Sequence, residues 1–437
     1  MTPLRTKVIL PVLFLGTITL NALGQFKFPP PDFGPEYVMP ETTTPPPPSG
    51  WYDIADVTVL SAALILAAYL ILKKRRRTYI FTLMVFCLIY FGFWREGCVC
   101  PIGSIQNITL ALFDPSYTVP LVVLAFFTLP LVFTLFFGRG FCAAVCPLGA
   151  LQDVVLISPV PVPPWLQHAL GLLAYVYFGA AVLFAATGSA FIICEYDPFV
   201  AFFRLSGSFN MLVLGGCFLL IGMFVGRPYC RFLCPYGVLL RLMSRFSQWK
   251  VTITPEECVQ CHLCRESCPF GAIETPTPEN LTPGSLRRDK LRLACLFLLL
   301  PVLVAAGGFL VSNMSIPLSR MHADVRLAER IYLEETGQVL DTVDETDAFR
   351  ATGKSTERLY ADADVIRRKL TAGGWILGGF LGLVLGAKLI RLSVHRRRSD
   401  YQAHRAYCLA CGRCYEYCPV HLEKIKNDSA TVIKVGG

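Results

Sequence analysis

Residues 137–153 read FGRGFCAAVCPLGALQD, and residues 225–241 repeat the pattern as VGRPYCRFLCPYGVLLR. Each copy follows a long apolar segment of the kind that forms a membrane-spanning helix. Each copy also carries a pair of cysteines, the second of which is followed by proline. The repeat predicts a duplicated unit of two helical hairpins with thiols at the same end of each hairpin.

The composition around this repeat is typical of a membrane protein. Hydrophobic residues make up 54% of the 437-residue chain and charged residues only 16%, a more apolar balance than soluble domains have. The formal net charge of +9 is gathered in short basic clusters beside the apolar segments, as the positive-inside rule describes. We therefore expect membrane lipid, and no nucleic acid, as the partner of these basic clusters.

Seven apolar segments beyond the N-terminus approach the length needed to cross about 30 Å of hydrocarbon. They are 57–72, 79–94, 119–137, 165–186, 209–225, 291–311 and 375–390. The basic run from Lys73 to Arg77 places the end of the first segment in the cytoplasm. Alternation then places 138–164, 226–290 and 391–437 in the cytoplasm, and 95–118, 187–208 and 312–374 outside. The expected fold is a mainly α-helical protein with seven or eight transmembrane helices in a bacterial-type inner membrane.

The remaining domains lie on either side of this membrane core, which is expected over 55–249. Residues 1–24 have the features of a signal sequence or signal anchor, and both forms stay open. Residues 25–54 are predicted to be a proline-rich extracytoplasmic linker. After the core we expect a first ferredoxin-like half (250–290) and a transmembrane helix (291–312). An extracytoplasmic loop domain (313–372), a second transmembrane helix (373–392) and a second ferredoxin-like half (393–437) follow.

Two cysteine runs carry the strongest signal for a cofactor. CVQCHLCRESCP supplies Cys258, Cys261, Cys264 and Cys268, and CLACGRCYEYCP supplies Cys408, Cys411, Cys414 and Cys418. Three thiolates at this spacing enclose one face of a [4Fe–4S] cubane, and the fourth follows a short turn that ends at a proline. Zinc is the main alternative, but the trailing Cys-Pro and the presence of two such runs argue against it. The adjacent His262 makes a c-type haem motif, which would require the opposite side of the membrane.

The two runs are expected to form one cytoplasmic α+β module with two clusters. In two-cluster ferredoxins the fourth cysteine of each run binds the cluster of the other run. This pattern predicts one cluster on Cys258, Cys261, Cys264 and Cys418, and the other on Cys408, Cys411, Cys414 and Cys268. The last two spans must then form a hairpin that returns the second run to the first.

The repeat cysteines are candidates for a third cluster at the cytoplasmic membrane edge. They are Cys142, Cys146, Cys230 and Cys234. Four thiols at one membrane depth match the ligand set of one [4Fe–4S] cluster, and the neighbouring Arg139, Arg227 and Arg231 would balance its charge. The alternative is that these are small cysteines packed between helices.

Three further cysteines, Cys98, Cys100 and Cys194, fall on the predicted outer side. They would form an outer cluster site if a further ligand completed it. The candidates for that ligand are a partner chain, Glu96, Glu195 and Asp197. An extracytoplasmic disulfide is the equal alternative, because that side of the membrane is oxidising.

The paired Gly-Arg-x-x-Cys-x-x-x-Cys-Pro helices and the ferredoxin-like module resemble the membrane polyferredoxin family over about residues 79–275 and 375–420. That family includes NapH-type quinol dehydrogenase subunits, NosR-type nitrous-oxide respiration factors and CcoG-type oxidase assembly factors. The resemblance implies electron transfer between the cytoplasm or quinone pool and an extracytoplasmic redox partner. The chain departs from the family pattern in its outer cysteines and in the membrane hairpin between its two ferredoxin runs.

The expected function is membrane-bound iron–sulfur electron transfer within a larger complex. The partner would be a cytochrome, a flavoprotein or a reductase, and quinone is a further candidate carrier. Two other functions stay open: a factor that assembles or matures a respiratory metalloenzyme, and a redox sensor. The sequence contains no recognisable catalytic residues, so whether the chain is an enzyme, such as a quinol dehydrogenase component, also stays open.

Overall fold

The computed structural model of the chain describes residues 50–97, 100–205, 208–249, 251, 258–277, 286–339, 341–394 and 398–423. All of these belong to one compact unit, Gly50–Gly437. The predicted signal segment, nearly all of the predicted linker, Cys98 and parts of both ferredoxin-like halves lie outside the described residues.

Within the described residues, five helical stretches are long and apolar enough to cross a membrane: Gly50–Lys74, Arg77–Trp94, Pro164–Ala186, Arg288–Asn313 and Thr356–Ser393. They contain α2 (Gly50–Tyr69) with η1 (Leu70–Lys74), α3 (Arg77–Cys87) with η2 (Leu88–Trp94), α8 (Pro164–Leu170) with α9 (Leu173–Ala186), α16 (Leu286–Asn313) and α20 (Thr356–Ser393). Two shorter apolar helices are α5 (Leu121–Phe137) and α12 (Phe209–Gly222). All seven predicted segments are therefore helical, and five have the length for a full crossing.

Two of these helices begin earlier than the sequence predicted. Helix α2 begins at Gly50, so the last residues of the predicted linker are helical. Helix α20 begins at Thr356, inside the predicted loop domain of residues 313–372. Residues 356–372 contain neither glycine nor proline, so nothing ends the helix where its apolar part begins.

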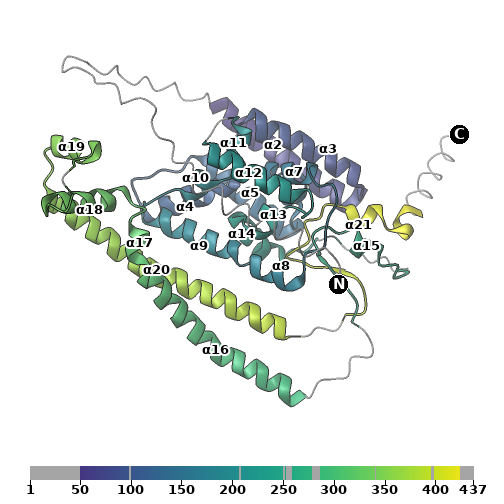
Figure 1. Cartoon of the computed structure of the whole chain (residues 1–437). Coiled ribbons are helices and arrows are strands. Elements are labelled where there is room, and N and C mark those ends of the chain that lie inside the picture. The colour runs from purple at the N-terminus through teal and green to yellow at the C-terminus, as the bar shows by residue number, and fades with distance from the viewer. Residues whose placement is uncertain are drawn as a thin grey trace. The chain divides into compact units, whose positions relative to one another are not determined.

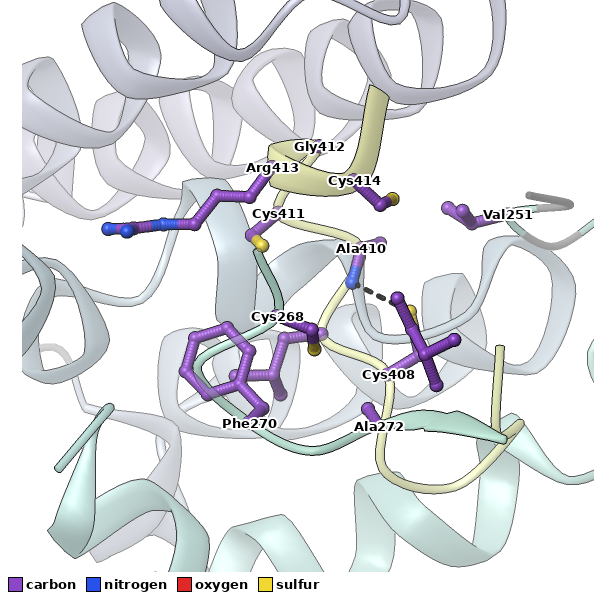
Figure 2. A pocket seen from close by; sticks show the side chains of 12 residues that line it. Val251, Cys268, Phe270, Ala272, Cys408, Ala410, Cys411, Gly412, Arg413 and Cys414 are labelled. Carbon is purple, nitrogen blue, oxygen red and sulfur yellow. Dashed lines mark hydrogen bonds between the residues drawn. The ribbon is translucent and has the colours of Figure 1, made fainter. Parts of the chain in front are cut away.

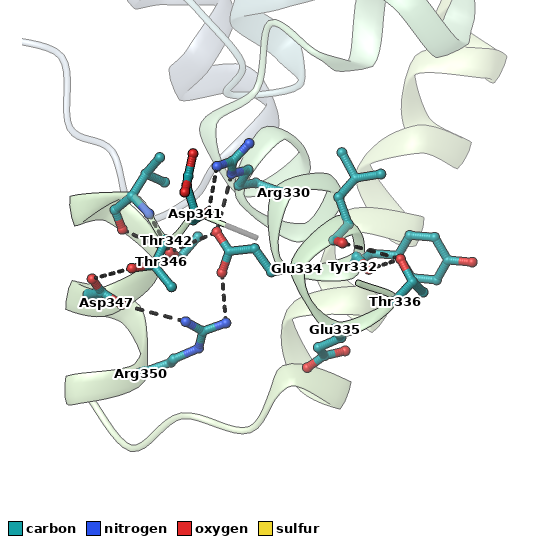
Figure 3. Close-up of polar contacts among 12 residues, drawn as sticks. Arg330, Tyr332, Glu334, Glu335, Thr336, Asp341, Thr342, Thr346, Asp347 and Arg350 are labelled. Atoms are coloured by element: carbon teal, nitrogen blue, oxygen red, sulfur yellow. Dashed lines mark hydrogen bonds and ion pairs between the residues drawn. The ribbon is translucent and has the colours of Figure 1, made fainter. Parts of the chain in front are cut away.

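The rest of the predicted loop domain folds into short helices, α17 (Ser315–Ser319), α18 (Ala323–Glu335) and α19 (Asp344–Ala351). Glu334 of α18 holds this segment together (Figure 3). Its carboxylate lies 2.7 Å from the guanidinium of Arg350 and 3.2 Å from that of Arg330, and it accepts a hydrogen bond of 3.1 Å from the Thr346 hydroxyl.

Helices α16 and α20 lie side by side and form the hairpin that separates the two cysteine runs (Figure 1). They approach closely because glycines face each other. A Cβ added to Gly378 would lie 2.0 Å from the Gly307 carbonyl oxygen, and one added to Gly382 would lie 2.2 Å from the Leu303 carbonyl oxygen. Small residues at such an interface let two helix backbones pack closely, which is a common solution in membranes.

Beyond the hairpin, a two-stranded antiparallel sheet joins the two cysteine runs. Strand β1 (Ile273–Glu274) pairs with β2 (Gln402–Ala403), so Ile273 lies opposite Ala403. The short helices α15 (Leu263–Glu266) and α21 (Arg413–Glu416) lie within the two cysteine runs and contact each other. The two runs therefore fold together as one small helix-and-strand module.

The cysteine repeat forms two locally equivalent helix pairs. They are α6 (Gly140–Ala144) with α7 (Pro147–Val154), and α13 (Pro228–Phe232) with α14 (Pro235–Ser244). In each pair the second cysteine donates its amide to the residue before the first cysteine, Cys146 to Phe141 at 3.0 Å and Cys234 to Tyr229 at 2.9 Å. Proline then starts the next helix, where its missing amide costs nothing. Helices α4 (Pro101–Phe113), α10 (Ile192–Tyr196) and α11 (Val200–Phe203) complete the core.

Candidate iron–sulfur sites

One cavity is lined by the three leading cysteines of the second run and the last cysteine of the first run. These are Cys408, Cys411, Cys414 and Cys268, which Figure 2 shows around the same space. The Ala410 amide donates to the Cys408 sulfur at 3.4 Å. We call this group the second-run site.

A second cavity is lined by Cys258, Cys261, Cys264 and Cys418. We call this group the first-run site. Each cavity is lined by four cysteine thiols, the ligand number of one [4Fe–4S] cluster. The thiols are thus grouped as crossed ligation requires, with each run lending its last cysteine to the other.

The two runs also share one loop conformation. Gln260 and His262 of the first run and Ala410 and Gly412 of the second all have positive φ angles, between 49° and 80°. These left-handed residues let each loop curl tightly around its cavity. The imidazole of His262, which completes the haem-like motif, pairs with the Tyr401 hydroxyl, while Cys264 and Cys418 complete the same cavity.

The repeat-cysteine site consists of Cys142, Cys146, Cys230 and Cys234, all four of which are buried. Hydrogen-bond donors point at their sulfur atoms. The Gln152 side-chain amide donates to Cys230 at 3.3 Å, the Gly237 backbone amide donates to Cys234 at 3.3 Å, and the Arg139 guanidinium lies 3.6 Å from Cys142. Donors of this kind stabilise sulfur that carries negative charge.

Buried positive charge surrounds the repeat-cysteine site. The side chains of Arg139, Arg227 and Arg241 are only 4%, 0% and 5% exposed. Buried cations require nearby negative charge, and Asp153 is the one buried carboxylate that pairs with any of these three within the described residues. Four thiolates around a [4Fe–4S] core would supply further negative charge, so the residues present fit that group.

Burial also governs the acidity of the thiols. It raises the pKa of Cys408 to about 12 and that of Cys230 to about 11, although Arg227 opposes the shift at Cys230. Such thiols are neutral at physiological pH and lose their protons only when a metal binds them. Within the described residues no three His, Cys, Asp or Glu side chains gather around a single ion. The cysteine spacing within the two runs and the trailing Cys-Pro favour a [4Fe–4S] cluster over one zinc ion.

The ferredoxin-like module contacts the repeat directly. A Cβ added to Gly226 would lie 3.0 Å from Pro269, the residue after Cys268. The Arg231 guanidinium donates to the Pro269 carbonyl at 3.4 Å, and the Arg139 guanidinium donates to the Ala406 carbonyl at 3.2 Å. The second-run site is therefore the part of the module that lies against the repeat-cysteine site.

Sequence reasoning missed the polar residues that fix this contact. Asp153 is fully buried and pairs with Arg77, Arg227 and Arg413, while Gln152 binds the repeat-cysteine site. The available signal was a Gln-Asp dipeptide that ends an otherwise apolar stretch, PLGALQD. Such polar residues beside a membrane segment mark functional positions.

Of the predicted outer cysteines, Cys98 lies outside the described residues. Cys100 directly precedes α4 and Cys194 lies in α10, and both are free thiols. The predicted disulfide alternative is therefore not formed between them in this structure.

Two family models match the chain. A 4Fe-4S binding domain matches residues 119–172 and 208–254, and a second 4Fe-4S binding domain matches residues 251–274. The first match includes both halves of the repeat-cysteine site, and the second includes the first cysteine run.

Curated proteins from bacteria and an archaeon are similar to parts of the chain. YccM of Escherichia coli (strain K12), provisionally named an electron transport protein, is 28% identical over 25% of this chain and 33% of its own length. Protein NirI of Paracoccus denitrificans is 29% identical over 27% of this chain and 18% of its own length. The uncharacterized protein MJ0750 of Methanocaldococcus jannaschii is 30% identical over 42% of this chain and 77% of its own length. The chain thus matches a third or less of YccM and NirI, and no solved structure matches it.

Proposed function

The chain belongs to the membrane polyferredoxin family with 4Fe-4S binding domains, and we propose that it conducts electrons between the cytoplasm and an extracytoplasmic redox partner. This chain shares iron–sulfur electron transport and several membrane helices with the family. The proposal adds the orientation, with the ferredoxin-like module in the cytoplasm of a bacterial-type inner membrane. It also adds three [4Fe–4S] sites on defined cysteines.

One observation supports a conduit above all others: the three groups of cysteines adjoin one another in a fixed order. The first-run and second-run sites exchange their last cysteines, so they share one module. Phe270, two residues after Cys268, lies under the guanidinium of Arg227 at 5.8 Å from its ring centre. Arg227 in turn donates to the carbonyls of Cys142 and Ala143. Arg227 and Phe270 therefore connect the second-run site to the repeat-cysteine site.

A bound [4Fe–4S] cluster supplies reversible one-electron chemistry. The chain's own residues would set where that chemistry occurs and at what potential. Gln152 and the Gly237 amide donate to the cysteine sulfurs of the repeat-cysteine site, and such hydrogen bonds raise the potential of a cluster. The buried guanidinium groups of Arg139 and Arg227 would likewise stabilise the reduced cluster, because it carries more negative charge than the oxidised cluster.

The proposal is testable with the purified protein in liposomes that enclose ferricyanide, with dithionite added outside. We expect the wild-type protein to reduce the enclosed ferricyanide well above the rate in protein-free liposomes. Replacing Cys146 with serine should remove about four irons per chain and reduce this rate to background. Replacing Cys217, a half-buried free thiol of α12, should change neither quantity and serves as the matched control.

Two results would contradict the proposal in different ways. Unchanged iron content in the Cys146→Ser variant would mean that the repeat cysteines only pack between helices. Normal iron content without any transmembrane reduction would favour a redox sensor. Transfer that appears only after a quinone is added to the bilayer would identify quinone as the carrier towards the far face.

A further inference from the structure

Helix α4, which lies outside the region that the family models match, repeats the sequence pattern of α7. CPIGSIQ at residues 100–106 corresponds to CPLGALQ at residues 146–152. In both, a cysteine precedes the helix, proline begins it, and glycine and glutamine follow at the same positions. The sequence therefore contains, besides CPFG at residues 268–271 of the first cysteine run, a Cys-Pro-x-Gly helix start like the two of the repeat-cysteine site.

The two glutamines make the same contact with a partner cysteine segment. The Gln152 side-chain oxygen accepts a hydrogen bond of 3.0 Å from the amide of Tyr229, the residue before Cys230. The Gln106 side-chain oxygen accepts one of 3.0 Å from the amide of Ile193, the residue before Cys194. Cys100 and Cys194 are thus related to each other as Cys146 and Cys230 are.

Asp197 occupies the place that Cys234 has in the repeat-cysteine site. Each follows its partner cysteine by one short helical turn, and each is followed by proline. Each side chain also accepts a backbone amide, Asp197 from Phe199 at 2.9 Å and Cys234 from Gly237 at 3.3 Å. Asp197 is only 4% exposed, whereas Glu96 and Glu195 are exposed, so burial selects Asp197 among the carboxylates.

An unpartnered buried amide indicates that a ligand belongs here. Gln106 is 1% exposed, and its side-chain nitrogen has no hydrogen-bond partner within the described residues. The equivalent nitrogen of Gln152 donates to the Cys230 sulfur. The Cys194 sulfur lies against the first turn of α4, 3.4 Å from the position that a Cβ on Gly103 would take. A buried donor at this place requires an acceptor.

Cys100, Cys194 and Asp197 lie close enough together for Asp197 and Cys194 to act electrostatically on the Cys100 thiol. Burial first, and then the charges of Asp197 and Cys194, raise the pKa of the Cys100 thiol to about 12. We infer that Cys100, Cys194 and Asp197 hold an additional iron–sulfur cluster with one carboxylate ligand. Cys98, the other sequence-predicted ligand, lies outside the described residues, so the inference rests on these three.

An aromatic contact connects this site to the repeat-cysteine site. Tyr229 precedes Cys230, is fully buried, and packs edge-on against Phe199 with ring centres 5.4 Å apart. Phe199 donates its amide to Asp197. The role of the new site as the outer carrier rests on the proposed conduit, whereas its ligand set does not.

The carboxylate ligand has a measurable consequence. Carboxylate oxygen binds cluster iron less strongly than thiolate sulfur does, so the iron at Asp197 should be the first to leave. When ferricyanide removes one electron from a [4Fe–4S]²⁺ cluster, that iron departs as Fe²⁺ and three Fe³⁺ remain with four sulfides. In the purified full-length protein we expect about one chelatable Fe²⁺ per chain at mild ferricyanide excess, together with the EPR signal of a three-iron cluster.

Variants of the three ligands and one neighbour test the assignment. Asp197→Cys should abolish the early iron release and the three-iron signal without lowering total iron, while Cys194→Ser should remove about four irons per chain. Glu195→Ala, an exposed carboxylate in the same segment, should behave like wild type. The irons of the other three sites report whether each variant is folded, and the liposome assay with Cys146→Ser tests the conduit separately. Unchanged iron release in Asp197→Cys, or a stoichiometric Cys100–Cys194 disulfide in mass mapping of the iron-loaded protein, would overturn the inference.

Discussion

The carboxylate of Asp153 in α7 lies 3.5 Å from the guanidinium of Arg413 in α21, beside Cys414. One residue belongs to the cysteine repeat and the other to the second cysteine run. The same carboxylate lies 3.5 Å from the buried guanidinium of Arg227 and also pairs with Arg77. One buried negative charge therefore joins the membrane core to the ferredoxin-like module and fixes the position of the second-run site.

Asp153→Asn should destabilise the protein by about 3–5 kcal/mol, because it leaves buried guanidinium groups without their negative partner. The expected result is a lower unfolding temperature in detergent and loss of contact between module and core, visible as faster limited proteolysis of the module. Asp364→Asn, which breaks an exposed pair with Arg368, should cost at most about 0.5 kcal/mol. Equal effects of the two variants would contradict the structural role of Asp153.

The stability that Asp153 contributes to the folded protein should decrease in acid. Burial alone would raise the pKa of Asp153, but Arg227, Arg77 and Arg413 outweigh it and hold the pKa well below its usual range. A carboxyl group with a lowered pKa stabilises the folded state above its unfolded pKa of about 3.9, and this contribution is lost as the pH falls further. We expect the contribution of Asp153 to stability to be constant between about pH 5 and 8 and to decline only below about pH 4. In the Asp153→Asn variant this acid-dependent component should be missing.

Crossed ligation predicts which pairs of substitutions act on one cluster. Cys268→Ser and Cys408→Ser both affect the second-run site, so the double variant should lose no more iron than either single variant. Cys268→Ser with Cys258→Ser should lose about twice as much iron, since the second substitution affects the first-run site. Iron and sulfide analysis with EPR distinguishes these cases. If each run held its own cluster, the two double variants would show the opposite pattern.

Gln152→Leu should make the midpoint potential of the repeat-cysteine cluster more negative, because the Cys230 sulfur loses a hydrogen bond from the amide. The potentials of the two clusters in the module should stay unchanged in a redox titration monitored by EPR. Gln106→Leu is the matched control, since this residue occupies the equivalent place in α4 and does not contact Cys230. An equal shift in both variants would indicate a general loosening of the core.

Gly378→Ala should disrupt the hairpin that returns the second run to the first. Its added Cβ would lie 2.0 Å from the Gly307 carbonyl, which is backbone and cannot move aside alone. We expect partial loss of iron from both module clusters and retention of the repeat-cysteine cluster. Gly216→Ala in α12 adds a Cβ with nothing within 4 Å and should resemble wild type. Full iron content in Gly378→Ala would mean that module assembly tolerates a wider hairpin.

Local patterns in the sequence determined the parts of this protein that depend on residues close together in the chain. Apolar length located all seven segments that proved helical, and cysteine spacing identified the runs. Helix ends were less predictable: α20 extends to Thr356 because no glycine or proline ends it. Apolar length describes the membrane-compatible part of a helix, whereas hydrogen bonding continues until a residue interrupts it.

Tertiary structure alone decided the contacts that no local pattern predicted. Cysteine spacing already indicated the grouping of Cys268 with Cys411, whereas the placement of Asp153 with Arg413 and of Gln106 beside Cys194 depends on helix packing. The energies involved are those of buried charges and unpaired donors, which arise only when the folded chain excludes water around both partners. The sequence by itself determined that the chain carries thiols for clusters at the ends of membrane helices. The fold decided which arginines, amides and carboxylates lie beside those thiols.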